Sequence, residues 1–283
     1  MAAKFFGQFL LEQGLIHRDQ LLTALEIQHA SNPILGELAQ ARGMLDAVQA
    51  RTINDHQRRE DKRFGDIAQA LGLLSAAQVD ELLAQQKAQR KLFGEILIEQ
   101  GMLGRDQVEQ ALQAQQAERE DAVQALDVGV AGHPMGEVLG AAIGTCNKLF
   151  PRILNTRCRF SSLVQSPADL AHCAVTGHVR VDAQPPLLIA LACDHATMTN
   201  IACAFLLVPV AECDETLAQD ALGELINVLM GYVAKDTLTE DARYRACPPD
   251  FGVPVDALLA RAKHPLAVSM ISELGPFVLM VGR

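Results

Sequence analysis

Apolar and glycine positions repeat along the first 116 residues with a period of 29. Each copy has a glycine after an apolar residue, a second glycine seven residues later, and a closing glutamine. These positions are Gly7, Gly36, Gly65 and Gly94; Gly14, Gly43, Gly72 and Gly101; and Gln28, Gln57, Gln86 and Gln115. Such regular recurrence predicts four copies of one structural unit.

The pattern within one copy predicts two helices joined by a tight turn. Residues 94–100 have the spacing of a short helix, and Gly101 follows where a helix often ends in a left-handed residue. Val108 and Leu112 then lie four residues apart, as on one side of a second helix. In the third copy Ser75 is a candidate N-cap for that helix. One helix pair cannot bury its own apolar side, so we expect neighbouring copies to pack together.

From residue 134 onward the pattern changes to mixed helices and strands. Polar residues fill 113–121 and glycine and proline punctuate 127–134, which places a boundary near residues 117–128. We therefore expect an all-α repeat region over 1–118 and a second domain over 128–283. The second domain should be an α/β sandwich with a largely antiparallel sheet. Its predicted helices cover 135–149, 196–205 and 214–234, and its predicted strands cover 174–181, 185–193, 266–269 and 277–282.

Charge and composition narrow the partners. The chain has 24 basic and 34 acidic residues and a net charge of −10, which argues against binding to nucleic acid. Its apolar runs are too short to cross a bilayer, and the first residues lack a signal-peptide pattern, so a cytoplasmic protein without membrane insertion is expected. The seven cysteines, from Cys146 to Cys247, form no CxxC pair and predict reduced side chains rather than a metal site.

The long predicted helix over 214–234 carries candidate chemistry. Asp220, Glu224, Asn227 and Gly231 share one side of it, opposite an apolar side. Gly223 flanks this polar stripe, and we expect the small residues to let another surface approach closely. An amide both donates and accepts hydrogen bonds, so it can orient a water molecule. The alternative without a function is an ordinary amphipathic helix whose polar side is solvated.

This stripe, with its D-x3-E-x2-N spacing, resembles the signature of the CheC/CheX/FliY chemotaxis phosphatases. The order of strands and helices over about residues 130–283 is also similar to that family. CheC-type members carry two such helices, but here the first candidate helix has Glu137 followed by Gly140, without the amide. A single complete stripe therefore resembles CheX more than CheC.

The resemblance implies hydrolysis of the aspartyl phosphate of a CheY-like receiver domain. It assigns water orientation to Asn227, pairing with the receiver's lysine to Glu224, and an auxiliary contact to Asp220. It also implies Mg²⁺ bound by the receiver, no cofactor of the protein's own, and a homodimer through the CheX-like domain. The alternative is a non-catalytic adaptor or scaffold with the same fold, with or without a response to cyclic di-GMP, acting in motility, pilus or secretion signalling.

The repeats resemble the MshE/GspE-type N-terminal domain over residues 4–116. In that family two consecutive copies can bind cyclic di-GMP through an opening arginine and the glycine-rich turns. Only the third copy keeps the arginine, so the candidate ligand residues are Arg63, Gly65 and Gly72. A protein-docking or scaffold role without a nucleotide is the other interpretation. A secretion or pilus ATPase is excluded for this chain, because its sequence has no G-x-x-x-x-G-K-[ST] loop.

Overall fold

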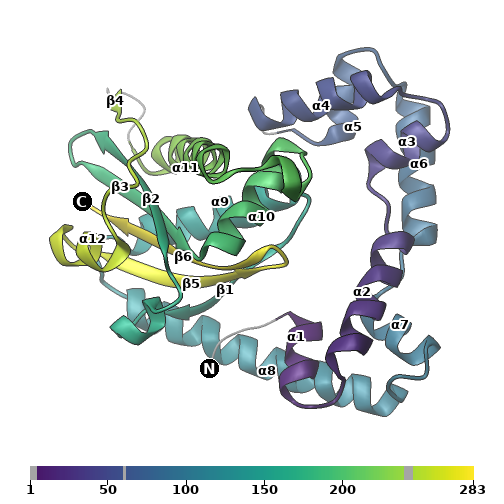
Figure 1. Ribbon diagram of the computed structural model, residues 1–283, viewed down its shortest axis with the longest axis horizontal. Coiled ribbons are helices and arrows are strands. Elements are labelled where there is room, and N and C mark those ends of the chain that lie inside the picture. Colours follow the sequence, from purple (N-terminus) through teal and green to yellow (C-terminus); the bar gives the residue numbers. More distant parts are fainter. Residues whose placement is uncertain (1–4, 60–61, 239–244) are drawn as a thin grey trace. The chain divides into compact units, whose positions relative to one another are not determined.

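The computed structural model describes residues 5–59, 62–238 and 245–283. It divides into two compact units, one covering Phe5–Gln116 and the other Ala117–Arg283 (Figure 1). None of the described helices is both long enough and apolar enough to cross a membrane.

Each of the four copies in the first unit forms a short helix followed by a longer one. The glycines after the short helices have positive φ angles of 64° to 68°, which is the left-handed conformation that the spacing predicts. Ser75 caps the third long helix, since its side chain accepts a hydrogen bond from the Gln78 N–H. The helices are α1 (Phe6–Glu12), α2 (Arg18–Ser31), α3 (Leu35–Ala41), α4 (Ala47–Arg59), α5 (Phe64–Ala70), α6 (Ala76–Gln89), α7 (Phe93–Glu99) and α8 (Arg105–Val130).

The copies pair in a nested order. The first copy shares a buried core with the fourth, in which Leu10 and Leu97 are both fully buried. The second copy shares a separate core with the third, around Ala39 and Ala68. The expectation that neighbouring copies pack together is therefore wrong for the outer two copies. Side-chain volume distinguishes the two cores, because the equivalent position holds leucine in the outer copies and alanine in the inner copies, and side chains of matching volume pack closely.

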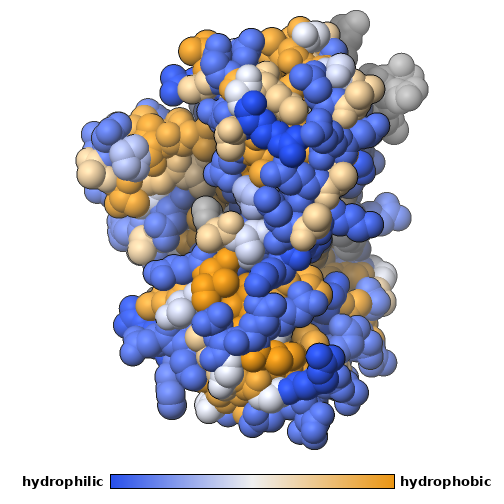
Figure 2. All heavy atoms as spheres, turned by 90° about the vertical axis from the view of Figure 1, so that its right-hand side faces the viewer, coloured by the Kyte–Doolittle hydropathy of each residue, from blue (hydrophilic) through white to orange (hydrophobic). Residues whose placement is uncertain are grey.

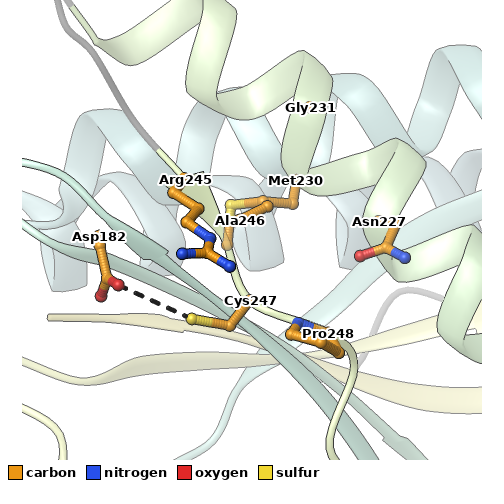
Figure 3. A pocket seen from close by; sticks show the side chains of 8 residues that line it. All are labelled: Asp182, Asn227, Met230, Gly231, Arg245, Ala246, Cys247 and Pro248. Atoms are coloured by element: carbon orange, nitrogen blue, oxygen red, sulfur yellow. Dashed lines mark hydrogen bonds between the residues drawn. The ribbon is translucent and has the colours of Figure 1, made fainter.

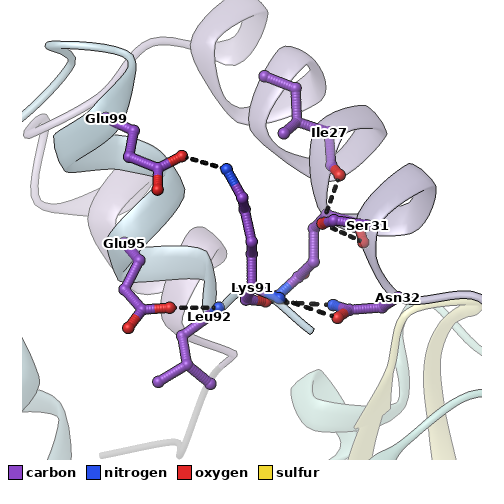
Figure 4. A network of polar contacts seen from close by, with 8 residues as sticks. Ile27, Ser31, Asn32, Lys91, Leu92, Glu95 and Glu99 are labelled. Atoms are coloured by element: carbon purple, nitrogen blue, oxygen red, sulfur yellow. Dashed lines mark hydrogen bonds and ion pairs between the residues drawn. The ribbon is translucent and has the colours of Figure 1, made fainter. Parts of the chain in front are cut away.

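The chain segments that enter and leave the inner pair are hydrogen-bonded to each other. The Asn32 side-chain amide donates to the Lys91 carbonyl over 3.2 Å, and the Lys91 N–H donates back to the Asn32 side-chain oxygen over 3.1 Å (Figure 4). The Lys91 ammonium also reaches the Glu99 carboxylate at 2.5 Å. The two hydrogen bonds between Asn32 and Lys91 join residues 59 positions apart and close the inner pair into a loop of its own.

The second unit is built on a six-stranded sheet in the order β1-β5-β6-β3-β2-β4. Every neighbouring pair of strands is antiparallel, which confirms the predicted antiparallel sheet. The strands are β1 (Cys158–Leu163), β2 (Val175–Asp182), β3 (Leu187–Cys193), β4 (Arg245–Ala246), β5 (Leu266–Ser272) and β6 (Gly275–Gly282).

Helices cover both faces of this sheet. The main core lies between one face and helices α9 (Gly136–Ile153), α10 (His195–Leu206) and α11 (Glu215–Thr237). A smaller core lies on the other face, under α12 (Val255–Arg261) and the short 3₁₀ turn Pro167–Leu170. The arrangement places α11 over β2 and β3, with one long side of the helix turned away from the sheet (Figure 1).

Three features of this unit differ from the sequence expectations. Helix α8 continues to Val130, so the boundary predicted near residues 117–128 lies within a helix and not in a linker. The polar run keeps helix-forming residues, and Gly129 alone does not break the helix. Helix α9 contains Pro151, which lies in its last turn, so it removes little of the hydrogen-bond ladder before the helix ends at Ile153. Strands β1 and β4 and helix α12 were not predicted, because each is too short to show a clear strand or helix period.

Candidate functional site

Helix α11 has a defined start and a buried side. The Asp214 carboxylate caps it by accepting a hydrogen bond from the Leu217 N–H over 2.8 Å. The four apolar residues that the sequence places on one side are all buried, with exposed fractions of 2% or less. These residues are Leu222, Leu225, Leu229 and Val233. Burial of that side fixes the rotation of the helix, and so it turns the polar stripe outward.

The stripe residues lie on the outer side of α11. Asp220, Glu224 and Gly231 are exposed and Asn227 is half-buried. Within the described part of the chain, neither Glu224 nor Asn227 has a side-chain hydrogen bond or an ion pair. The carboxylate and the amide, one turn apart, are therefore available to another molecule.

A cavity of about 660 Å³ opens beside the stripe, and Asn227 is part of its wall (Figure 3). Helix α11 forms one wall, and the end of β2, strand β4 and the residues after it form the rest. The lining residues are Asp182, Asn227, Met230, Gly231, Arg245, Ala246, Cys247 and Pro248. No spacing in the sequence connects the residues of β2 and β4 with Asn227, since only the sheet register brings them together.

Strand β4 is held against β2 by a short antiparallel ladder. Asp182 stands opposite Arg245 in this ladder, and the Cys247 N–H donates to the Arg180 carbonyl over 2.8 Å. The Cys247 thiol also lies 3.9 Å from the Asp182 carboxylate. The ladder therefore fixes the backbone of the cavity wall that faces α11.

The two glycines near the stripe have different roles. A Cβ atom on Gly231 would have no heavy atom within 4 Å, so this position leaves open space beside Asn227. A Cβ atom on Gly223 would lie 3.1 Å from the Pro249 Cβ atom. Gly223 thus admits the protein's own loop, and the expectation that it leaves room for another protein is wrong.

The other helix considered from the sequence, α9, carries Glu137 and Gly140 at exposed positions. A Cβ atom on Gly140 would meet nothing within 4 Å. Gly140 therefore takes the place on α9 that Asn227 has on α11, and it leaves open space there without a functional side chain.

The three candidate residues for cyclic di-GMP lie at the start and end of α5. Arg63 is the N-cap residue and its side chain is exposed. Gly65 is buried, and a Cβ atom there would lie 2.8 Å from a Val79 methyl group, so glycine allows α5 and α6 to approach closely. Gly72 has a φ of +68° at the end of the helix. Helix packing and backbone conformation thus account for both glycines.

In the described ranges, no group of three or more His, Cys, Asp or Glu side chains is arranged to hold a metal ion. The chemistry of the site is that of an amide, carboxylates and a guanidinium.

No protein family and no curated protein matches the chain in sequence comparisons. Several solved structures of chemotaxis proteins are similar to about half of it. The chemotaxis protein CheX from Desulfovibrio desulfuricans has 12% identity and a TM-score of 0.39, over 51% of this chain and 97% of that one. CheX from Vibrio vulnificus has 11% identity and a TM-score of 0.41, over 52% and 95%. A chain of the CheX–CheY–BeF₃–Mg²⁺ complex from Borrelia burgdorferi has 11% identity and a TM-score of 0.39, over 51% and 96%. Identities and scores of this size do not assign the chain to a family.

Proposed function

We propose that the second unit hydrolyses the aspartyl phosphate of a CheY-like receiver domain. One observation carries the proposal: Glu224 and Asn227 lie one turn apart on the outer side of α11, without partners in the described chain. An ordinary solvated helix side would need neither the amide nor the open cavity beside it.

The reaction is attack of water on an acyl phosphate. A bond forms between the water oxygen and phosphorus, the bond from phosphorus to the aspartate oxygen breaks, and a carboxylate and inorganic phosphate are released. Catalysis of such a step depends mostly on positioning and on charge, because the phosphoryl group is already activated. Asn227 orients the attacking water through its amide, while the receiver brings its own Mg²⁺.

The neighbouring acidic residues supply docking contacts. Glu224 pairs with the active-site lysine of the receiver, which lies beside the phosphorylated aspartate. Asp220 adds a second acidic contact one turn away. Both carboxylates are exposed, so pairing costs little desolvation. Gly231 leaves the space into which the partner's loops approach.

Phosphate release from phosphorylated receiver domains tests this proposal. Purified full-length protein is mixed with receivers from the same organism, each phosphorylated with acetyl phosphate. We expect Asn227→Ala to lower the catalysed rate about 100-fold, the size typical of a lost positioning group. Asn147→Ala, which changes an exposed asparagine on α9, is the matched control and should keep the wild-type rate. Equal rates for wild type and Asn227→Ala would overturn the catalytic role, and binding without release would identify an adaptor.

For the first unit we propose a docking role towards another protein. Large apolar side chains of the repeats remain exposed, and Figure 2 shows apolar side chains in orange at the surface among polar ones in blue. These exposed residues are Leu11, Leu15, Leu22, Leu25, Val48, Leu71, Leu83, Leu92 and Leu112. Cyclic di-GMP binding at Arg63, Gly65 and Gly72 is the alternative. Calorimetry of the full chain with cyclic di-GMP separates the two: heat that Arg63→Ala abolishes supports the nucleotide.

We also propose that the second unit forms a homodimer, in keeping with the resemblance to CheX. Light scattering over a range of protein concentrations measures the mass directly. A mass of one chain at every concentration would overturn this part of the proposal.

A further inference from the structure

The cavity beside Asn227 contains a second group with suitable chemistry, the guanidinium of Arg245. Arg245 lies in β4, is exposed, and lines the same cavity as Asn227 (Figure 3). Its backbone is held by the ladder to β2. The backbone of Arg245 is thus held in place, and no hydrogen bond or ion pair of its guanidinium is found among the described residues.

The charge of Arg245 is not neutralised within the described part of the chain. The nearest candidate is Asp182, which stands opposite it in the ladder. The Asp182 carboxylate instead lies beside the Cys247 thiol, and no ion pair joins it to Arg245. A cation without a partner therefore faces a cavity that also presents an amide.

We infer that Arg245 binds the phosphoryl oxygens of the group on which Asn227 acts. A guanidinium presents several N–H donors in a plane and matches two oxygens of one phosphoryl group. Asn227 on α11 and Arg245 on β4 line the same cavity, and the inference places the phosphoryl group between them. This inference rests on the proposed phosphatase function, and it names a phosphoryl-binding residue that the D-x3-E-x2-N stripe does not contain.

Asp182 carries a negative charge in the same cavity, so its removal should change the affinity in the direction opposite to removal of Arg245. Its carboxylate is the acidic group among the lining residues, and it disfavours an anion in the cavity. Removing the Arg245 charge should therefore weaken binding of a phosphorylated partner, whereas removing the Asp182 charge should strengthen it. A merely structural role for β4 would make both substitutions harmful.

The experiment measures the affinity of the full chain for the receiver that gives the fastest phosphate release. The receiver is used in two forms, unmodified and loaded with beryllium fluoride and Mg²⁺ to mimic the aspartyl phosphate. We expect Arg245→Gln to weaken binding of the loaded form about tenfold, as for loss of one charge-assisted hydrogen bond. Binding of the unmodified form should stay the same. Arg245→Lys should recover part of the loss, and Asp182→Asn should tighten binding of the loaded form several-fold.

Failure of this inference can be told apart from failure of the proposed function. If Asn227→Ala abolishes phosphate release while Arg245→Gln keeps the wild-type preference for the loaded form, only the role of Arg245 is overturned. If no receiver loses phosphate faster with wild-type protein, and loaded and unmodified forms bind equally, both proposals are overturned. Circular dichroism melting of each variant checks that the fold is kept.

Discussion

Two glycines of α11 allow a comparison at the scale of single residues. Gly231 faces open space, so Gly231→Ala should stabilise the protein by about 0.5–1 kcal/mol through helix propensity. At Gly223 the same gain is opposed by crowding, since the new methyl group would lie 3.1 Å from Pro249. We expect Gly223→Ala to be the less stable of the two variants. Urea unfolding measures both, and the reverse order would show that the Pro249 loop does not pack as described.

His178 predicts a pH dependence of stability. It is buried in β2 with 6% of its surface exposed, and burial lowers its pKa from the ordinary value of 6.5. The Asp250 carboxylate, 4.0 Å from the ring, acts in the opposite direction, and Arg180 adds to the lowering. Because the unfolded chain takes up the proton more readily, the contribution of neutral His178 is present above about pH 6.5 and is lost as the pH falls below it.

The measurement is urea unfolding of wild type and His178→Gln at pH 7.5 and pH 5.5. Wild type should lose more stability between the two pH values than the variant, which lacks the titrating group. An equal loss in both proteins would show that other groups cause the acid sensitivity.

Residue-scale features differed in how far the sequence could predict them. The outward position of Glu224 and Asn227 follows from helical periodicity, because the apolar side of α11 is unambiguous. Arg245 could not be connected to Asn227 in the same way. Strand β4 has only two residues, and its pairing with β2 is a contact between segments far apart in the sequence.

At the scale of elements, the turn glycines of the repeats have a measurable cost of replacement. Gly72 has a φ of +68°, where a Cβ atom is disfavoured, so Gly72→Ala should destabilise the protein by about 1–2 kcal/mol. Gly104→Ala is the matched control, since Gly104 has no positive φ and no close contact around a new methyl group. Thermal unfolding of the two variants makes the comparison. Equal stability would mean that the turn can take another conformation at little cost.

Elements with a strong period were predictable and those without one were not. The long helix, the alternating strand at β2 and the apolar strand at β3 follow directly from residue spacing. The continuation of α8 as far as Val130 was not predictable, because Gly129 and the glycine and proline that follow are equally typical of a linker. Helix α12 has only seven residues, too few for a clear period.

At the scale of the whole molecule, the nested pairing of repeats is the feature that the period alone could not reveal. A 29-residue period states that four equivalent units exist, but it does not state which unit meets which. The core residues hold that information: Leu10 and Leu97 occupy one core, and Ala39 and Ala68 occupy the other. The first and fourth copies thus share a core although the two inner copies separate them in the sequence.

This pairing predicts how a core mutation spreads through the repeats. Leu10 is fully buried among residues of the first and fourth copies, so Leu10→Ala should leave a cavity and cost about 2–5 kcal/mol. Local unfolding should increase in the helices that share this core. Hydrogen exchange followed by mass spectrometry is therefore expected to be faster in α7, more than 80 residues away, while α3 and α5 keep their protection.

Leu82→Ala is the reciprocal control, because Leu82 is fully buried in the core of the second and third copies. It should speed exchange in α3 and α5 and leave α1 and α7 protected. If Leu10→Ala instead exposes α3, the next helix pair along the chain, the copies pair in sequence order. Ala39→Leu adds volume to the closely packed inner core, so its effect on exchange should likewise be confined to the helices of the second and third copies.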